Sequence, residues 1–149
     1  MPSDLIRESE RAAVISLKAD APLAEIIAPG SIDPVSENPA WPFVRLDGFQ
    51  ATLEGHGCSA RSEIRFRAHS FAKPRYLNDD PKSGIPIETA RDHAGRLNSA
   101  VVAALRNRAF TVDGRRYRFV VTNSILLQDG SERDTYHGMA SVVARAYQG

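Results

Sequence analysis

The residues of this chain whose types and spacing come nearest to a catalytic site lie in two neighbouring segments of alternating sequence. Asp47 falls in the first segment, and Glu63 and Arg65 fall in the second. Two carboxylates and a lysine that converge on Mg²⁺ would make a small metal-dependent nuclease or hydrolase. Arg65 stands where that chemistry needs the lysine, and a guanidinium stays protonated and cannot act as a base. Pairing of carboxylates with arginines across adjacent strands explains the same residues, so the nuclease is the less favoured alternative.

Other patterns that carry chemistry are weaker still. The histidines are scattered, and only His56 has a cysteine close by, Cys58, whereas a zinc site takes about four ligands. The sequence holds no Gly-x-Ser-x-Gly elbow, no Walker loop and no dinucleotide-binding fingerprint. We therefore expect a protein that is not an enzyme and that carries no cofactor and no metal.

The segment from Ser59 to Phe71 alternates with a period of two. One set of alternate positions holds Ser62, Ile64, Phe66 and Ala68, and the other holds Arg61, Glu63, Arg65, Arg67 and His69. Side chains alternate across a strand, so the first set is predicted to face a core and the second to face away from it. A strand that only meets solvent would carry more Thr, Ser and Gln. The charged face is therefore predicted to meet a partner.

A second basic stripe lies near the C-terminus, where Arg116 and Arg118 alternate with Tyr117 and Phe119. The aromatic side chains fall on the face opposite the arginines, which favours a core role over stacking on nucleic-acid bases. The chain has 19 basic and 18 acidic residues, and this balance argues against a dedicated nucleic-acid binder. An acid, Glu63, among arginines suits pairing with a second copy of the chain. Both stripes are predicted to form a subunit interface or to line a channel.

The remaining patterns predict one α+β domain over residues 1–149, with a mostly antiparallel sheet and two helices packed on one face. The helices are expected at 4–19 and 88–106, and the main strands at 43–53, 59–71, 116–127 and 133–147. An extended loop at 72–86 is rich in Pro, Asp and Asn, and loops of that length are commonly functional. The single cysteine and the absence of a long apolar run predict a soluble protein made in the cytoplasm.

Several segments of the chain are similar to one known family. They are the continuation of the first helix at 17–23, the strand entry at 42–46, the charged strand at 64–70, the helix at 90–105 and the strand at 136–140. With the order of the elements, these segments resemble the tail-completion or tail-terminator proteins of long-tailed bacteriophages and gene transfer agents. The resemblance runs over most of the chain.

The resemblance implies a structural virion protein at the tail–neck junction, without enzymatic activity. Such proteins form a homo-oligomeric ring, commonly a hexamer, that caps the tail-tube protein and joins it to a neck or stopper protein. DNA would pass through the ring without sequence-specific binding, and no membrane is involved. A neck stopper or adaptor is the neighbouring alternative. The loop residues expected to reach a neighbouring subunit or an adjoining ring are Lys73, Arg75, Tyr76, Asp79 and Asp80.

Overall fold

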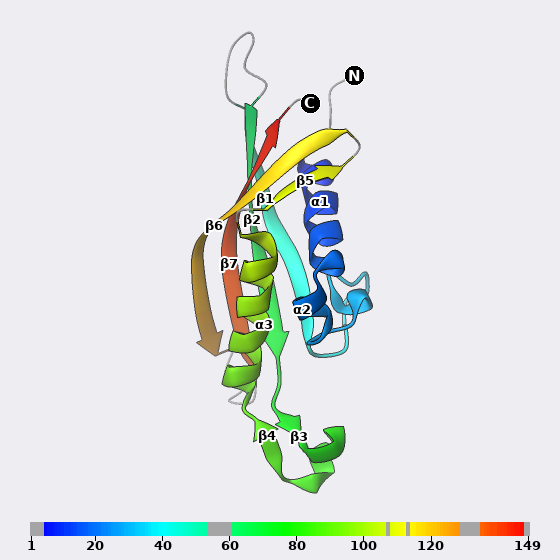
Figure 1. Ribbon diagram of the computed structural model, residues 1–149. Helices are drawn as coiled ribbons and strands as arrows, with labels where there is room; N and C mark the ends of the chain where they lie inside the picture. Colours follow the sequence, from blue (N-terminus) through cyan, green and yellow to red (C-terminus); the bar gives the residue numbers. More distant parts are fainter. Residues whose placement is uncertain (1–4, 54–60, 107, 113, 129–134, 148–149) are drawn as a thin grey trace.

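Five strands form the main sheet, in the order β1-β2-β7-β6-β5 with every neighbouring pair antiparallel. The computed structural model describes residues 5–53, 61–106, 108–112, 114–128 and 135–147 (Figure 1). The strands are β1 (Phe43–Leu53), β2 (Arg61–Ala72), β5 (Ala109–Val112), β6 (Arg115–Gln128) and β7 (Tyr136–Tyr147). The predicted α+β class with a mostly antiparallel sheet is confirmed.

Two helices, α1 (Leu5–Ala19) and α3 (Ala90–Leu105), pack against the same face of the sheet (Figure 1). α3 begins after Thr89, whose Oγ1 accepts a hydrogen bond from the Asp92 N–H at 3.1 Å and so caps the first turn. A short helix α2 (Ala21–Ala24) and a 3₁₀ turn (Pro29–Ser31) follow α1. Within the part of the chain that the structure describes, no helix has the length and hydropathy needed to span a bilayer.

The core lies between these helices and the sheet. Leu17 of α1 and Leu97 of α3 are fully buried, and they belong to one cluster with Phe66 of β2 and Phe119 of β6. Along β2 the residues Ile64, Phe66 and Ala68 are buried, as the alternation predicted, and Ser70 and Ala72 continue the buried face. The aromatic residues of the second basic stripe, Tyr117 and Phe119, are buried in the same core. No described helix or strand packs on the opposite face of the sheet, and we call it the uncovered face. The segment before β1 contacts only its end near Phe43, where Trp41 lies against the rings of Phe43 and Phe71.

The region expected to be an extended loop projects from the domain and contains a short hairpin. β2 runs on to Ala72, and then β3 (Arg75–Tyr76) pairs with β4 (Pro86–Glu88). Between them lie two 3₁₀ turns, made possible by left-handed backbone at Asn78, Asp79 and Gly84. We call residues 73–88 the arm, and it extends beyond the lower end of the sheet (Figure 1).

Other boundaries differ by a few residues. The second helix starts at Ala90, two residues later than predicted, because Thr89 takes the capping position. The last strand starts at Tyr136. His56 and Cys58 lie outside the described residues.

Candidate functional site

The uncovered face gathers arginines from four strands. Strand pairing aligns Glu63 of β2 with Arg145 of β7, and Arg145 with Arg118 of β6. The described charged residues on this face are Arg45, Arg65, Arg67, Arg116, Arg118 and Arg145, with Asp47 and Glu63. Six arginines and two carboxylates give the described part of this face a net charge of +4, although the whole chain carries only +1.

The predicted interface residues are thus brought to one face, from strands that are far apart in the sequence. Arg65, Arg67, Arg116 and Arg118 are exposed there. Glu63 is half-buried, and its Oε1 lies 3.9 Å from Nη2 of Arg65. The backbone of Arg61 pairs with Tyr147 in the same sheet, and its side chain lies outside the described part.

The two carboxylates of the nuclease alternative do not meet. Asp47 lies opposite Arg67 and Glu63 lies opposite Thr52, so the two acids are separated by four positions along β2. Asp47 instead contacts His69, whose Nε2 lies 2.6 Å from Oδ1 of Asp47. Among the described residues, no group of three or more His, Cys, Asp or Glu is arranged to hold a metal ion. The structure therefore gives no support to a site built on Asp47 and Glu63.

A chain of polar contacts on the lower part of this face was not predicted. Nδ1 of His69 lies 2.5 Å from Nε2 of His137, which continues the contact from Asp47 across three strands. The rings of Phe71 and His137 stack at 4.4 Å, and the group lines a cavity of about 280 Å³. Sequence spacing does not reveal this cluster, because it depends on the register that places Phe71 opposite His137.

The arm is fastened to α3 by a clamp around Glu88. The Glu88 carboxylate accepts hydrogen bonds from Nε and Nη2 of Arg96, both at 2.9 Å, and from Nη1 of Arg75 at 3.4 Å. The hydrogen bonds from Arg96 lower the pKa of Glu88, and the same pairing raises the pKa of Arg96. The two-pronged contact fixes the direction in which the arm leaves the domain.

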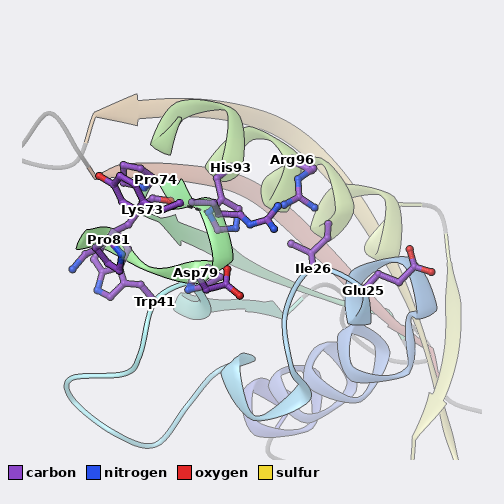
Figure 2. A pocket seen from close by; sticks show the side chains of 12 residues that line it. Glu25, Ile26, Trp41, Lys73, Pro74, Asp79, Pro81, His93 and Arg96 are labelled. Carbon is purple, nitrogen blue, oxygen red and sulfur yellow. Dashed lines mark hydrogen bonds between the residues drawn. The ribbon is translucent and has the colours of Figure 1, made fainter. Parts of the chain in front are cut away.

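A cleft of about 490 Å³ lies beside this clamp, between the arm, α3 and the segment around Trp41 (Figure 2). Nζ of Lys73 lies 4.9 Å from the centre of the Trp41 ring, a cation–π geometry. The backbone oxygen of Lys73 also lies 2.8 Å from Nδ1 of the buried His93. Of the predicted arm residues, Lys73, Arg75, Tyr76 and Asp79 line the cleft. Asp80 instead accepts a hydrogen bond from the Lys82 N–H at 2.9 Å and so caps the second 3₁₀ turn.

Comparison with known proteins decides the family. The sequence model described as "Tail completion protein gp17" matches residues 12–147 of this chain. The chain belongs to this tail completion family. The predicted family is therefore confirmed, and the chain is a structural tail protein of bacteriophage or gene transfer agent type.

The fold of this tail completion protein recurs in a solved structure described as "Virion of native gene transfer agent (GTA) particle". A chain of that structure superposes with a TM-score of 0.74 at 16% sequence identity, over 98% of this chain and 99% of that chain. At this identity the likeness establishes the fold. No curated protein matches the chain.

Proposed function

We propose that this tail completion protein is a tail terminator, a homo-oligomeric ring at the tail–neck junction of the virion. The ring, with six copies as the expected number, would cap the tail tube and join it to the neck or stopper protein. The observation that carries this proposal is the arginine-rich uncovered face, which lies opposite a face sealed by α1 and α3.

In such a ring the helices face outward and the uncovered face lines the channel. DNA that passes through the channel is a polyanion, and the net charge of +4 on the described part of this face offsets it without reading bases. The interspersed acids Asp47 and Glu63 keep the lining from holding DNA tightly. A face of this composition suits passage of DNA better than stable binding.

The arm supplies the second contact surface. Leu77, Ile85 and Ile87 are 42%, 53% and 53% exposed, although they are large and apolar. Exposed apolar side chains gathered on one projecting element are typical of a protein contact. We propose that the arm reaches a neighbouring subunit or the adjoining ring of the tail tube or neck.

Assembly with tail-tube protein tests the proposal. The purified chain is mixed with tail tubes and examined by negative-stain electron microscopy and mass measurement, and rings at tube ends are expected. The double variant Ile85→Ser with Ile87→Ser should lose ring formation, whereas Val35→Ser, a fully exposed site outside the arm, should keep it. A chain that stays monomeric at high concentration with tail tubes present would overturn the proposal.

A further inference from the structure

We propose that neighbouring copies in the ring join edge to edge, so that their sheets close into one continuous barrel. The outer edge of β1 at residues 47–53 would pair with the outer edge of β6 at residues 120–128 of the next copy. This inference rests on the proposed ring, and it adds which strands meet and in which register.

The first observation is a long unprotected edge on β6. β5 pairs only with Arg115–Arg118, and one further bond joins the Phe119 N–H to the Arg108 oxygen. Beyond that point, no described strand pairs with the outer edge of residues 120–128. These nine residues include no charged residue and no proline. Exposed edges are normally blunted by charges or proline, so an edge without them is suited to pairing with another strand.

β1 also has an unpaired edge at its other end, and past the bulge at Gly48 the residues 50–53 of this edge carry no charge and no proline. The start of β1 is occupied, since Asp33 N–H bonds the Val44 oxygen at 2.6 Å and Asp33 Oδ1 accepts from the Leu46 N–H at 3.3 Å. From Asp47 to Leu53, no described segment pairs on the side away from β2. Each copy therefore has two unpaired stretches of strand edge, residues 47–53 of β1 and residues 120–128 of β6. We call them the free halves of β1 and β6.

Strand direction allows these two edges to pair. The four long strands alternate in direction in the order β1-β2-β7-β6, so β1 and β6 run in opposite directions. A second copy related by rotation about a ring axis places its β6 antiparallel to β1 of the first. In this arrangement the helix-covered faces of all copies lie on the outside of the ring, and their uncovered faces together line the channel.

The register follows from which face each side chain occupies. Within one copy, pairing aligns Gln50 with Arg65, Arg65 with Val143, and Val143 with Val120. These residues form one row on the uncovered face. Without a stagger, Gln50 would meet Val120 of the next copy, at the upper limit of the free half of β6.

Pairing the free halves along their length requires a stagger between copies. Partners across a sheet share a face, so Gln50 must meet a residue of the uncovered face. Ile125 meets this condition near the centre of the free half, and it lies opposite Met139, four positions before Val143 along β7. The expected partner of Gln50 is therefore Ile125 of the next copy.

This stagger is the one that a closed barrel needs. The stagger between neighbouring copies is four residues, and each copy contributes four long strands, so the stagger is one residue per strand. An eight-stranded barrel with a shear of 8 has the same ratio and a strand tilt of about 36°, inside the usual range for barrels. The ratio does not depend on how many copies complete the ring.

The direction of the stagger also agrees with the right-handed twist of barrel strands. In the lower half of Figure 1, α3 lies in front of the sheet, β6 is at the left and β1 is at the right and runs upward. The right-handed twist of strands makes barrel strands rise toward the right when seen from outside, so the right-hand neighbour is displaced upward. That displacement brings the lower half of its β6, residues 120–128, beside the upper half of β1.

Cysteine cross-linking of assembled rings tests the register. In a Cys58→Ser background, Gln50→Cys is combined with Ile125→Cys, the rings are assembled on tail tubes, and oxidised glutathione is added. Within one copy these positions are separated by three strand spacings of about 4.8 Å each, too far for a disulfide. The matched control combines Gln50→Cys with Val120→Cys, the partner expected without a stagger.

Edge pairing with this stagger predicts a ladder of covalent dimers and larger products on a denaturing gel, about tenfold more abundant for the Ile125 pair than for the Val120 pair. Rings in which the Val120 pair cross-links better would overturn the stagger. Intact rings in which neither pair cross-links would overturn the edge pairing and leave the proposed function standing. Absence of rings for the unmodified chain with tail tubes would overturn the proposed function itself.

Discussion

Gly138 of β7 lies directly beneath Asn98 of α3. A Cβ placed on Gly138 would lie 2.6 Å from the Cβ of Asn98, closer than real Cβ atoms approach a neighbour. The Asn98 amide also donates a hydrogen bond at 2.7 Å to Oγ of Ser124 on β6. This contact therefore sets how closely the long helix approaches two central strands.

We predict that Gly138→Ala destabilises the fold by about 1–3 kcal/mol, because helix and strand must move apart to admit the methyl group. Denaturant unfolding measures the change. Gly95→Ala is the matched control, since its Cβ would meet only Leu126 Cδ2 at 3.7 Å. Alanine also suits a helix interior, so this variant should gain about 0.5–1 kcal/mol. Equal stability of the two variants would contradict the packing described for α3 on β7.

Tyr117 and Glu8 make the next prediction, because they join β6 to α1. The buried Tyr117 hydroxyl donates a hydrogen bond of 2.6 Å to Oε2 of Glu8, which also lies 3.2 Å from Nε of Arg115. Tyr117→Phe should cost about 1.5–3 kcal/mol, since the bond involves a charged acceptor. Tyr76→Phe on the arm is the control and should leave the free energy of unfolding unchanged. Unfolding curves that coincide for both variants would rule out a stabilising role for the bond.

The Glu88 clamp predicts a pH-dependent arm. Because the hydrogen bonds from Arg96 lower the pKa of Glu88, the clamp is complete above the ordinary glutamate value of 4.5. Its stabilisation is lost as the pH falls through the lowered folded-state pKa. The protection factors of the amides of residues 73–88, which correct hydrogen exchange for its intrinsic pH dependence, should therefore stay high at neutral pH and fall only in acid.

Glu88→Gln should accelerate that exchange already at neutral pH, roughly tenfold, as expected for a loss of about 1.4 kcal/mol. Asp79→Asn is the control, because Asp79 is exposed on the same arm and asparagine tolerates its left-handed backbone. Exchange in Glu88→Gln that matches the unmodified chain at pH 7 would show that the arm is held by other contacts.

Much of the fold could be predicted from local sequence, because periodicity is a local property. The alternation of Ile64 and Phe66 with Arg65 and Arg67 revealed which face of β2 is buried, and the apolar spacing around Leu97 revealed α3. The strand pairing within the arm was not predicted, because its strands are only two and three residues long. Such pairing depends on tertiary anchors such as Glu88 and Arg96, not on a pattern within the segment.

The candidate site was predictable only where it follows a single strand. Arg65 and Arg67 could be placed on one face, whereas the contact of His69 with His137 depends on the register between β2 and β7. Residues distant in sequence carry no mark of that register in a single chain. For the same reason the free halves of β1 and β6 became visible only when strand order was known.

In the proposed ring, charge on the uncovered face should govern the interaction with DNA. Arg65→Gln with Arg118→Gln lowers the net charge of its described part from +4 to +2. The salt dependence of DNA binding by assembled rings should weaken by a slope of about 1 for each phosphate that is no longer neutralised. Stability should change by less than about 0.5 kcal/mol, since both side chains are exposed.

Arg91→Gln is the control for this charge effect. Arg91 is exposed on α3, the helix-covered side of the molecule. It should leave both the salt slope and the stability unchanged. An equal loss of salt dependence from Arg91→Gln would mean that the uncovered face is not the surface that meets DNA.

Cryo-electron microscopy of tail tubes capped with this protein is the decisive test of the proposed ring. We expect one ring at the tube end, with the β-sheets and Arg65, Arg67 and Arg118 facing the channel and α1 and α3 facing outward. A ring whose channel is lined by the helices, or tubes that carry no ring at saturating protein, would contradict the proposal.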